Sequence, residues 1–363
     1  MQQTNRGNYN STETFSIALA NTLFCNVDMA KITIKELAKH LNLSISTVSR
    51  ALNDSHEIKT ATKQKVKEMA IQLGYTPDVY ASNLRSRKSK TIGIIIPEIT
   101  NSFFSQVING IQDVAMENGY HVLIYLTHEN YEQEVAVARL LLDGRVDGVL
   151  ISVSDSTSNG AHLDEFRERN IPVILFDRIF DQFQTLKITT DDFESGLHAA
   201  QLLIKKGCKH LSYLSFSPNL SIDQRRKTGF VKAAEKAGIQ YSIVPLDKSN
   251  ANREDVLTGV LGGEDAPDGI FSPVESLGLL VYEVCYKLNK RIPEDVKVLS
   301  FSNLKIAAML NPPLTTITQP ALEIGRYACT ALFKAMRNNF LYDDEELIMP
   351  SILIERQSTE GNG

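Results

Sequence analysis

The sequence predicts a small all-α head near the amino terminus and a larger α/β body, in which parallel sheets carry helices on both faces. A length of 363 residues exceeds one ordinary core and suggests two or three domains. Apolar residues between positions 34 and 73 recur at the spacing of helices. From residue 91 onward, short apolar strands alternate with helix-length segments, which is typical of parallel sheets.

The head is expected to begin with two short helices joined by a tight turn. Thr33 and Glu36 form a capping-box pattern before the first helix, and Ser44 is a suitable N-cap for the second. Inward-facing apolar residues then define three helices: Ile34, Leu37, Ala38 and Leu41; Val48, Ala51 and Leu52; and Val66, Met69, Ala70 and Leu73, followed by Gly74. This spacing matches a helix-turn-helix, whose second helix enters the DNA major groove, and it also fits an ordinary three-helix bundle.

The charge of the chain is unevenly distributed. Residues 30–90 carry a net charge of +7, although the whole chain carries −5 and residues 91–363 carry −11. The head is therefore the part of the chain that is suited to a polyanion such as DNA. A solvated basic surface without a partner is the alternative interpretation.

Alternating strands and helices are expected in the body. A helix is predicted over 104–117, after the first strand. The strands are predicted over 92–96, 121–126, 148–153, 172–176, 210–216, 269–272 and 296–300.

Several classes of protein are disfavoured by the sequence. The four cysteines, Cys25, Cys208, Cys285 and Cys329, are scattered, so we expect neither a disulfide framework nor a metal site. No phosphate-binding loop, nucleophile elbow or zinc motif is present, so we expect no catalytic activity and no cofactor. The stretch 15–25 contains polar residues and lacks a basic leader beyond Arg6, so we expect a cytoplasmic protein rather than an exported one.

Four segments of the head resemble the lactose-repressor/galactose-repressor (LacI/GalR) family of transcriptional regulators. They are ITIKELA at 32–38, SISTVSRALN at 44–53, TKQKV at 62–66 and LGYTP at 73–77, and the resemblance runs from about 30 to 358. It implies a homodimeric regulator of transcription, usually a repressor, that binds a pseudo-palindromic double-stranded DNA operator. It also implies three parts: a helix-turn-helix head at 30–77, a hinge helix and linker at 78–90, and a body at 91–358. Residues 1–29 show no sustained helical or strand periodicity, so we expect them to be a disordered extension or the product of an upstream start.

The resemblance assigns roles to the second head helix. The implied base-reading residues are Ile45, Ser46 and Arg50. The implied phosphate contacts are Ser44, Thr47, Ser49 and Asn53. Arginine can pair with guanine through two hydrogen bonds, whereas Ile45 offers an apolar contact to a thymine methyl group or, alternatively, packs on the edge of the protein.

Residues 78–84 resemble the hinge helix of the family. The resemblance implies that Ala81 and Leu84 lie in the minor groove, with Leu84 as a wedge between base pairs. A plain interdomain linker is the alternative.

The body resembles the regulatory domain of the family, which is a two-lobed α/β domain like the periplasmic sugar-binding proteins. The segments that carry this resemblance are 94–104, 191–196, 226–230 and 313–320. The implied lobes are about 91–189 with 319–349, and about 190–318 with 350–358. An exported solute-binding protein of the same body fold is the alternative, but it does not account for the head.

A cleft between the lobes is implied as the site of a small-molecule effector, such as a carbohydrate or a related metabolite. Carried over by position, the residues of the cleft are Phe103, Phe104, Val107, Asp177, Arg178, Arg226, Val274, Glu275, Ser302 and Ala321. The sequence departs from the family at Val274-Glu275, where an Asn-Asp pair is usual, and at 300–302, where Gly-Phe-Asp is usual. Because those side chains grip sugar hydroxyls in the family, we expect an effector that differs from a typical hexose, or weak affinity.

Overall fold

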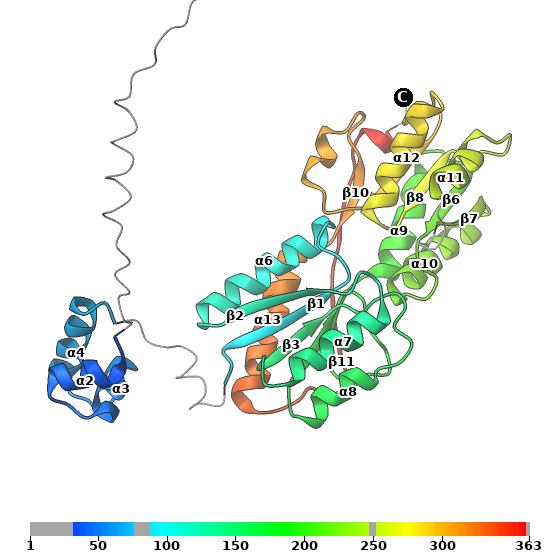
Figure 1. Cartoon of the computed structure of the whole chain (residues 1–363). Helices are drawn as coiled ribbons and strands as arrows, with labels where there is room; N and C mark the ends of the chain where they lie inside the picture. Colours follow the sequence, from blue (N-terminus) through cyan, green and yellow to red (C-terminus); the bar gives the residue numbers. More distant parts are fainter. Residues whose placement is uncertain (1–31, 76–87, 247–251, 361–363) are drawn as a thin grey trace, which may run out of the picture. The chain divides into compact units, whose positions relative to one another are not determined.

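A computed structural model describes residues 32–75, 88–246 and 252–360 of the chain. The chain divides into two compact units, Met1–Ser82 and Asn83–Gly363 (Figure 1). The extension at 1–29 and the hinge residues Ala81 and Leu84 lie outside the described residues.

The head consists of three helices, α2 (Ile34–Leu41), α3 (Ile45–Leu52) and α4 (Thr60–Gln72). The capping box is present at the start of α2, where the Thr33 backbone N–H donates to Glu36 Oε2 at 2.7 Å. Asn42, at a φ of 55°, ends α2 in the left-handed region, and Ser44 then caps α3. The buried core of the head contains Leu37, Ala38, Leu41, Val48, Ala51, Val66 and Ala70.

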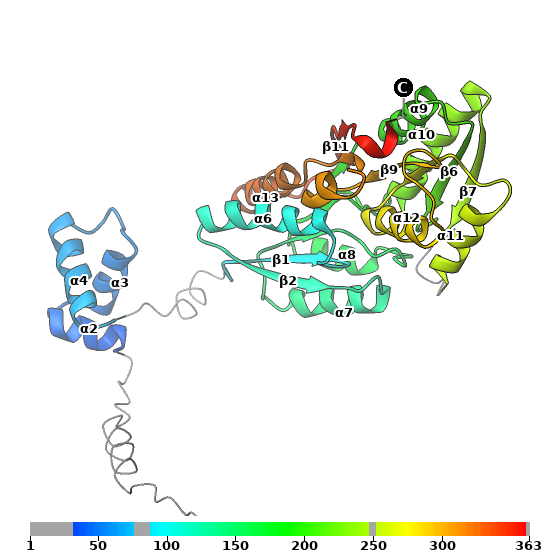
Figure 2. The ribbon, with the colours of Figure 1, turned by 90° about the horizontal axis from the view of Figure 1, so that it is seen from above.

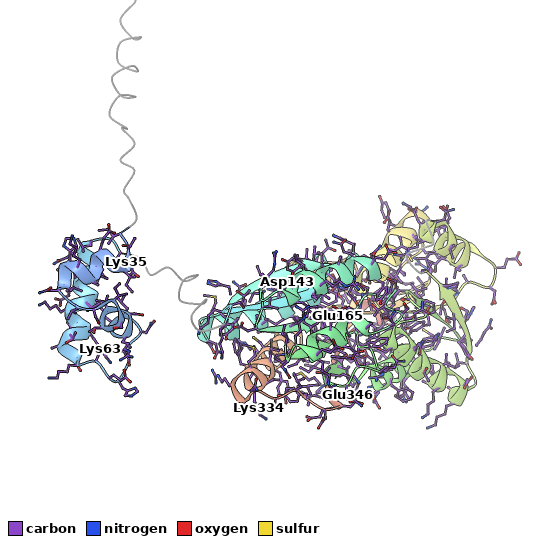
Figure 3. The ribbon with its side chains drawn as sticks, turned by 60° about the horizontal axis from the view of Figure 1, so that its bottom comes forward. Lys35, Lys63, Asp143, Glu165, Lys334 and Glu346 are labelled. Atoms are coloured by element: carbon purple, nitrogen blue, oxygen red, sulfur yellow. The ribbon has the colours of Figure 1, made fainter. Side chains whose placement is uncertain are left out.

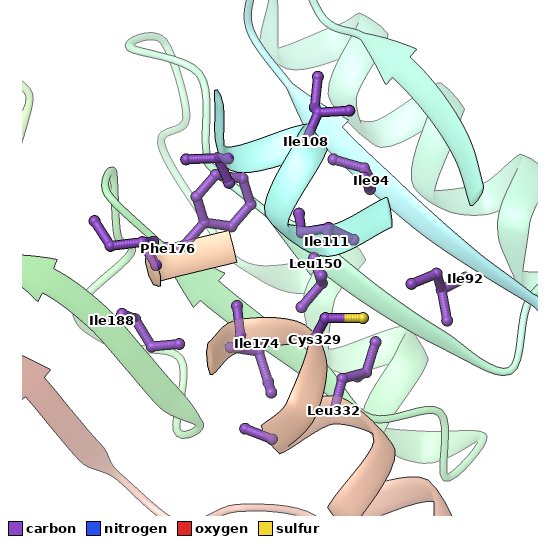
Figure 4. Close-up of a cluster of buried hydrophobic side chains, with 14 of the residues drawn as sticks. Ile92, Ile94, Ile108, Ile111, Leu150, Ile174, Phe176, Ile188, Cys329 and Leu332 are labelled. Atoms are coloured by element: carbon purple, nitrogen blue, oxygen red, sulfur yellow. The ribbon is translucent and has the colours of Figure 1, made fainter. Parts of the chain in front are cut away.

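The larger unit contains two six-stranded sheets. The first is entirely parallel and has the order β11-β5-β4-β3-β1-β2. Its strands are β1 (Thr91–Ile96), β2 (His121–Leu126), β3 (Gly148–Ile151), β4 (Val173–Phe176), β5 (Leu186–Thr190) and β11 (Glu345–Met349). Helices α6 (Ser102–Glu117) and α13 (Ala321–Asn338) cover one face, where the buried side chains of Figure 4 lie. Helices α7 (Tyr131–Leu142) and α8 (Ala161–Glu168) cover the other face.

The second sheet has the order β12-β10-β9-β8-β6-β7 and is parallel except for β12. Its strands are β6 (His210–Ser215), β7 (Gln240–Pro245), β8 (Gly269–Ser272), β9 (Lys297–Phe301), β10 (Thr315–Thr318) and β12 (Ile352–Ile354). Helices α9 (Asp192–Lys205) and α10 (Ser221–Ala237) cover one face, and α11 (Arg253–Gly262) and α12 (Glu275–Lys287) cover the other. Two short 3-10 helices, Lys305–Met309 and Gln357–Thr359, complete this lobe.

Each sheet with its helices forms one lobe, and the chain passes between the lobes at three points. It leaves the first sheet after β5, returns from the second sheet after β10, and passes from β11 to β12. The predicted fold class, a helical head with a two-lobed body of largely parallel sheets covered on both faces, is confirmed. Charged side chains project from both units, among them Lys35 and Lys63 on the head and Asp143 and Lys334 on the body (Figure 3). Among the described helices, none has both the length and the apolar character needed to cross a membrane.

Glycines allow the paired helices of each lobe to approach closely. A Cβ atom on Gly229 of α10 would lie 1.9 Å from a backbone oxygen of α9, and a Cβ on Gly196 of α9 would lie 2.0 Å from the Arg226 oxygen. The first lobe has the same arrangement, since Gly110 of α6 and Gly325 of α13 would each place a Cβ 2.1 Å from the facing backbone, and Figure 2 shows these helices side by side. The close packing of each helix pair therefore requires glycine at these positions, where any side chain would collide with the facing backbone.

Gly229→Ala is expected to lower the free energy of unfolding by about 1–3 kcal/mol, because the added methyl group must push α9 and α10 apart. The matched control is Gly259→Ala in α11, where an added Cβ has no atom within 4 Å. The control should leave stability unchanged or raise it by up to about 1 kcal/mol, since alanine favours a helix over glycine. Urea unfolding of both variants measures the difference, and equal stabilities would contradict the close contact.

Candidate functional site

Helix α3 of the head presents a polar face to solvent. Its inward face buries Val48 and Ala51. On the outer side, Ser44, Ile45, Ser46, Arg50 and Asn53 are exposed, and Thr47 and Ser49 are half-buried. Ile45 is 37% exposed and so does not pack into the described head core. The predicted base-reading residues therefore share one accessible face.

The amino terminus of α3 is suited to an anion. Ser44 Oγ accepts the Thr47 N–H at 3.1 Å and lies 2.8 Å from both the Ser46 and Thr47 hydroxyl oxygens. The first turn contains no acidic residue. Free N–H groups and the helix dipole favour a phosphate at such a position.

Arg50 lies near the carboxyl end of α3 and pairs with Glu57 at 2.8 Å. The Arg50 side chain is 60% exposed in this pair, and an ion pair in solvent contributes little to stability. The guanidinium can therefore exchange Glu57 for a base edge at small cost.

A pocket lies between the two lobes of the body, at the carboxyl ends of their strands. Crevices of this kind are the usual ligand sites of parallel α/β folds. Its free volume is about 30 Å³, the space of about one water molecule. The first lobe contributes Asn101, Phe103, Phe104, Asp177 and Arg178; the second contributes Ile222, Arg226, Pro273, Val274, Glu275, Phe301, Ser302 and Asn303; and Gln319 comes from the segment between the lobes.

Most of the residues predicted for the cleft meet in this pocket. Val107 and Ala321 are the two that do not line it, because their side chains are buried in the core between α6, α13 and the first sheet. Sequence reasoning missed six lining residues, namely Asn101, Ile222, Pro273, Phe301, Asn303 and Gln319. Asn101 carries a local signal, since it is the N-cap of α6 and its side chain accepts the Phe103 N–H at 2.9 Å.

Arg226, one of two buried arginines that line the pocket, is fixed by an ion pair, a hydrogen bond and an aromatic contact. Its side chain is 3% exposed, and its Nε donates to Asp192 Oδ1 at 2.7 Å. Its Nη1 donates to the Pro273 carbonyl oxygen at 2.6 Å, and the guanidinium lies 3.6 Å from the centre of the Phe301 ring. Within the described structure, Arg226 Nη2 and Asp192 Oδ2 have no hydrogen-bond partner. Of the two residues, Arg226 lines the pocket, so its Nη2 is the group that a ligand can reach.

Burial raises the pKa of Asp192 to about 6, in spite of the neighbouring guanidinium. Desolvation is the largest cause, Arg226 opposes it, and the charge of Asp177 adds to it. The removal of this carboxyl group from water therefore outweighs its attraction to Arg226.

Arg178 provides a second buried cation on the opposite side of the pocket. Its Nη1 donates to the Glu129 carboxylate at 2.7 and 2.8 Å, and its guanidinium lies 5.8 Å from the centre of the Phe104 ring. Phe103 and Phe104 meet edge to face with ring centres 5.3 Å apart, and both rings are buried. The aromatic pair therefore packs within the first lobe as well as lining the pocket.

Polar contacts cross the pocket from one lobe to the other. Glu275 accepts hydrogen bonds from Ser102 in the first lobe and Ser302 in the second. Gln319 Nε2 donates to Asp177 Oδ1 at 3.1 Å and to Thr190 Oγ1 at 3.2 Å. Among the described residues, no group of three or more potential metal ligands is present.

Asp192 should give the stability of the body a defined pH dependence. Its pKa is raised from 3.8 to about 6 on folding, so the folded state binds this proton more tightly than the unfolded state. Stability from this group is therefore greatest below about pH 4 and is lost as the pH rises through about 6, a loss on the order of 3 kcal/mol.

Arg226→Leu should destabilise the protein by about 3–5 kcal/mol at pH 8, because it leaves a buried carboxylate without its cation. At pH 5 the loss should be smaller, since Asp192 can then take up a proton. Urea unfolding at the two pH values measures the difference, with Lys236→Ala on the exposed side of α10 as the control. Equal losses at pH 5 and pH 8 would contradict the pairing.

Two family models match the chain. Residues 33–78 match the bacterial regulatory proteins of the lacI family, and residues 200–359 match a periplasmic binding protein-like domain. Together the two models cover more than half of the chain.

Named relatives match over nearly the full length. The chain is 28% identical to catabolite control protein A of Priestia megaterium, over 91% of this chain and 99% of that protein. It is 27% identical to the ribose operon repressor of Halalkalibacterium halodurans, over 91% of this chain and 97% of that protein. These relatives are regulators rather than enzymes, in agreement with the expectation of no catalytic activity.

Solved structures show the same fold. The crystal structure of the lac repressor dimer, bound to operator and the anti-inducer ONPF, matches with a TM-score of 0.80 at 20% identity, over 91% of this chain and all of that chain. A periplasmic binding protein/LacI transcriptional regulator from Alkaliphilus metalliredigens, complexed with D-xylulofuranose, matches with a TM-score of 0.65 at 27% identity, over 75% of this chain and all of that chain.

The motifs of the head, the two-lobed body and the agreement with relatives over both units lead to one assignment. The chain combines a DNA-binding domain of the lacI family of bacterial regulatory proteins with a periplasmic binding protein-like body, and LacI-type regulators such as catabolite control protein A are similar to it over both.

Proposed function

We propose that the protein is a sequence-specific, DNA-binding transcription regulator that acts as a repressor and responds to a small molecule held between the lobes of its body. The observation that carries this proposal is the exposed face of α3, where Ser46 and Arg50 lie beside Ile45 on a head of net positive charge. In this arrangement, Ile45, Ser46 and Arg50 read bases, while Ser44, Thr47, Ser49 and Asn53 contact phosphates.

The proposal also assigns a role to each segment of the chain. Residues 30–77 bind DNA, 78–90 form the hinge and linker, and 91–358 bind the effector and the second subunit. Ala81 and Leu84 of the hinge enter the minor groove. Because these segments act on DNA, the proposed location is the cytoplasm.

A homodimer is the proposed assembly. A structural neighbour, the lac repressor, is a dimer on its operator. On the body of the present chain, Met116 and Leu123 in the first lobe and Ile306 and Met309 in the second are exposed apolar residues. Burial of such side chains favours association with another apolar surface, and two copies of one head fit a pseudo-palindromic operator.

The proposed effector is a carbohydrate or a related metabolite. The relatives include a ribose operon repressor, and a structural relative at 27% identity binds D-xylulofuranose. The unpaired Arg226 Nη2 is a donor that lines the pocket, which suits a ligand with hydroxyl groups.

Selection from a random duplex library tests the DNA-binding proposal. The purified full chain should enrich a pseudo-palindromic site, and enrichment of no sequence, with or without added sugars, would overturn the proposal. The affinity for the enriched site should also fall steeply with salt, because phosphate contacts release counterions.

Arg50→Ala should weaken binding to the enriched site by about 1–3 kcal/mol, because one pair of hydrogen bonds to a base is lost. Binding to random duplex should weaken much less. Lys65→Ala, which removes an exposed cation of α4, is the control and should affect both duplexes about equally. Competition gel-shift assays measure the ratio, and an equal loss on both duplexes for Arg50→Ala would contradict base reading.

Leu84→Ala should reduce the affinity for the enriched site and the bend of the bound DNA together, because an apolar wedge that opens a base step also bends the duplex. The gel mobility of circularly permuted fragments measures the bend. An unchanged bend would remove the wedge role and leave residues 78–90 as a plain linker.

A further inference from the structure

The first turns of α6 and α12 meet across the pocket, from opposite lobes. Helix α6 begins at Ser102 in the first lobe, and α12 begins at Glu275 in the second. The first N–H groups of a helix lack partners within the helix and carry a partial positive charge. The start of α6 is therefore a favourable position for an anion.

The side chain of Glu275 occupies this position. Its Oε1 accepts the Ser102 hydroxyl at 2.9 Å and lies 3.5 Å from the Ser102 backbone nitrogen. Its Oε2 accepts the Ser302 hydroxyl at 3.0 Å. One carboxylate therefore joins the start of α6 in the first lobe to Ser302, after β9, in the second.

A neighbouring contact reinforces this bridge. Gln106, one turn after Ser102 on α6, donates from Nε2 to the Asn303 carbonyl oxygen at 3.1 Å. With Glu275 in place, the free volume of the pocket is about 30 Å³, which is too small for a sugar. A ligand can enter this pocket only when the side chains or the lobes move apart.

We propose that Glu275 is a built-in bridge that holds the two lobes together across the pocket, so that closure of the body does not require an effector. The proposal rests on the proposed function in one respect, since it takes this pocket to be the effector site. An effector then has to displace the Glu275 carboxylate from Ser102 before it can contact both lobes.

Charge-assisted hydrogen bonds of this kind give the bridge a measurable strength. A hydrogen bond to a charged group contributes about 1.5–3 kcal/mol, which corresponds to a factor of about 10 to 160 in an equilibrium constant. Removal of the carboxylate should therefore speed the amide exchange of segments facing the pocket, namely 101–107 and 301–304, by about that factor.

Hydrogen exchange of the full chain, followed by mass spectrometry, tests the bridge. Glu275→Ala and Ser102→Ala should both speed exchange in segments 101–107 and 301–304, because each removes the contact between the lobes. Ser302→Ala should have a smaller effect, since the contact from Glu275 to Ser102 is kept. The matched control is Glu283→Ala on the same helix, where the carboxylate pairs with Lys287 within the second lobe, and it should leave exchange unchanged.

Sodium formate provides a second test, because it can place a free carboxylate between Ser102 and Ser302 in the Glu275→Ala variant. Formate should slow exchange in this variant toward the wild-type rate, whereas sodium chloride at the same ionic strength should not. Circular dichroism first establishes that each variant is folded. If Glu275→Ala is not folded, Ser102→Ala takes its place in the hydrogen-exchange experiment.

Three results would overturn the proposal: equal exchange in Glu275→Ala and Glu283→Ala, no acceleration in Ser102→Ala, or no recovery with formate in folded Glu275→Ala. None of these measurements involves DNA. A failure of the bridge is therefore distinguishable from a failure of operator selection, which would overturn the proposed function instead.

Discussion

The buried pair of Arg226 and Asp192 is the interaction on which the second lobe's side of the cleft depends. It forms because Gly196 and Gly229 let α9 and α10 touch backbone to backbone, which brings the start of α9 beside the middle of α10. The same guanidinium binds the Pro273 carbonyl after β8 and covers Phe301 of β9. A single cation thus joins two helices and two strand ends. The pKa of Asp192 is raised although Arg226 lowers it, so desolvation of this carboxyl group outweighs the charge of the neighbouring guanidinium.

Helix amino termini serve both units in the same physical way. In the head, the first turn of α3 is rich in hydroxyl groups and free of acidic residues, which suits an external phosphate. In the body, the first turn of α6 already faces an anion, because the Glu275 carboxylate accepts the Ser102 hydroxyl at 2.9 Å and lies 3.5 Å from the Ser102 nitrogen. The start of α3 is therefore exposed where a polyanion is the proposed partner, whereas the start of α6 is met by an acid of the chain itself.

Local signals predicted much of this structure, and long-range packing decided the rest. Residues adjacent in sequence form the capping box at Thr33 and the apolar runs of strands such as β1 and β3. The sequence therefore predicted both kinds of feature. Five strands were not predicted: β5, β7, β10, β11 and β12. Strands β7 and β11 mix polar and apolar residues and lack a continuous buried run. Strands β5 and β10 are buried inside the sheets, but their sequences, LKITT and TTIT, are too polar to stand out as apolar runs. Positions just after strands, such as Asp177 and Glu275, reached the pocket because strand ends share one edge of a sheet. Val107 was predicted to line the cleft, but its position on α6 directs its side chain into the core of the first lobe. Gln319 was missed because its hydrogen-bond partners, such as Asp177, are distant in sequence.

The length of the side chain at 275 connects these observations to effector choice. The family resemblance places a shorter acid at this position and an Asp at 302, where this chain has Glu275 and Ser302. The additional methylene of glutamate carries the carboxylate toward α6, and the small serine at 302 removes a second negative charge that would repel it. The two differences from the family act together: a carboxylate at 275 lies between the lobes, and no carboxylate at 302 opposes it. Under the proposed function, an effector at this pocket would meet the hydroxyl groups of Ser102 and Ser302 from two sides once Glu275 has moved, and each hydroxyl can donate or accept a hydrogen bond.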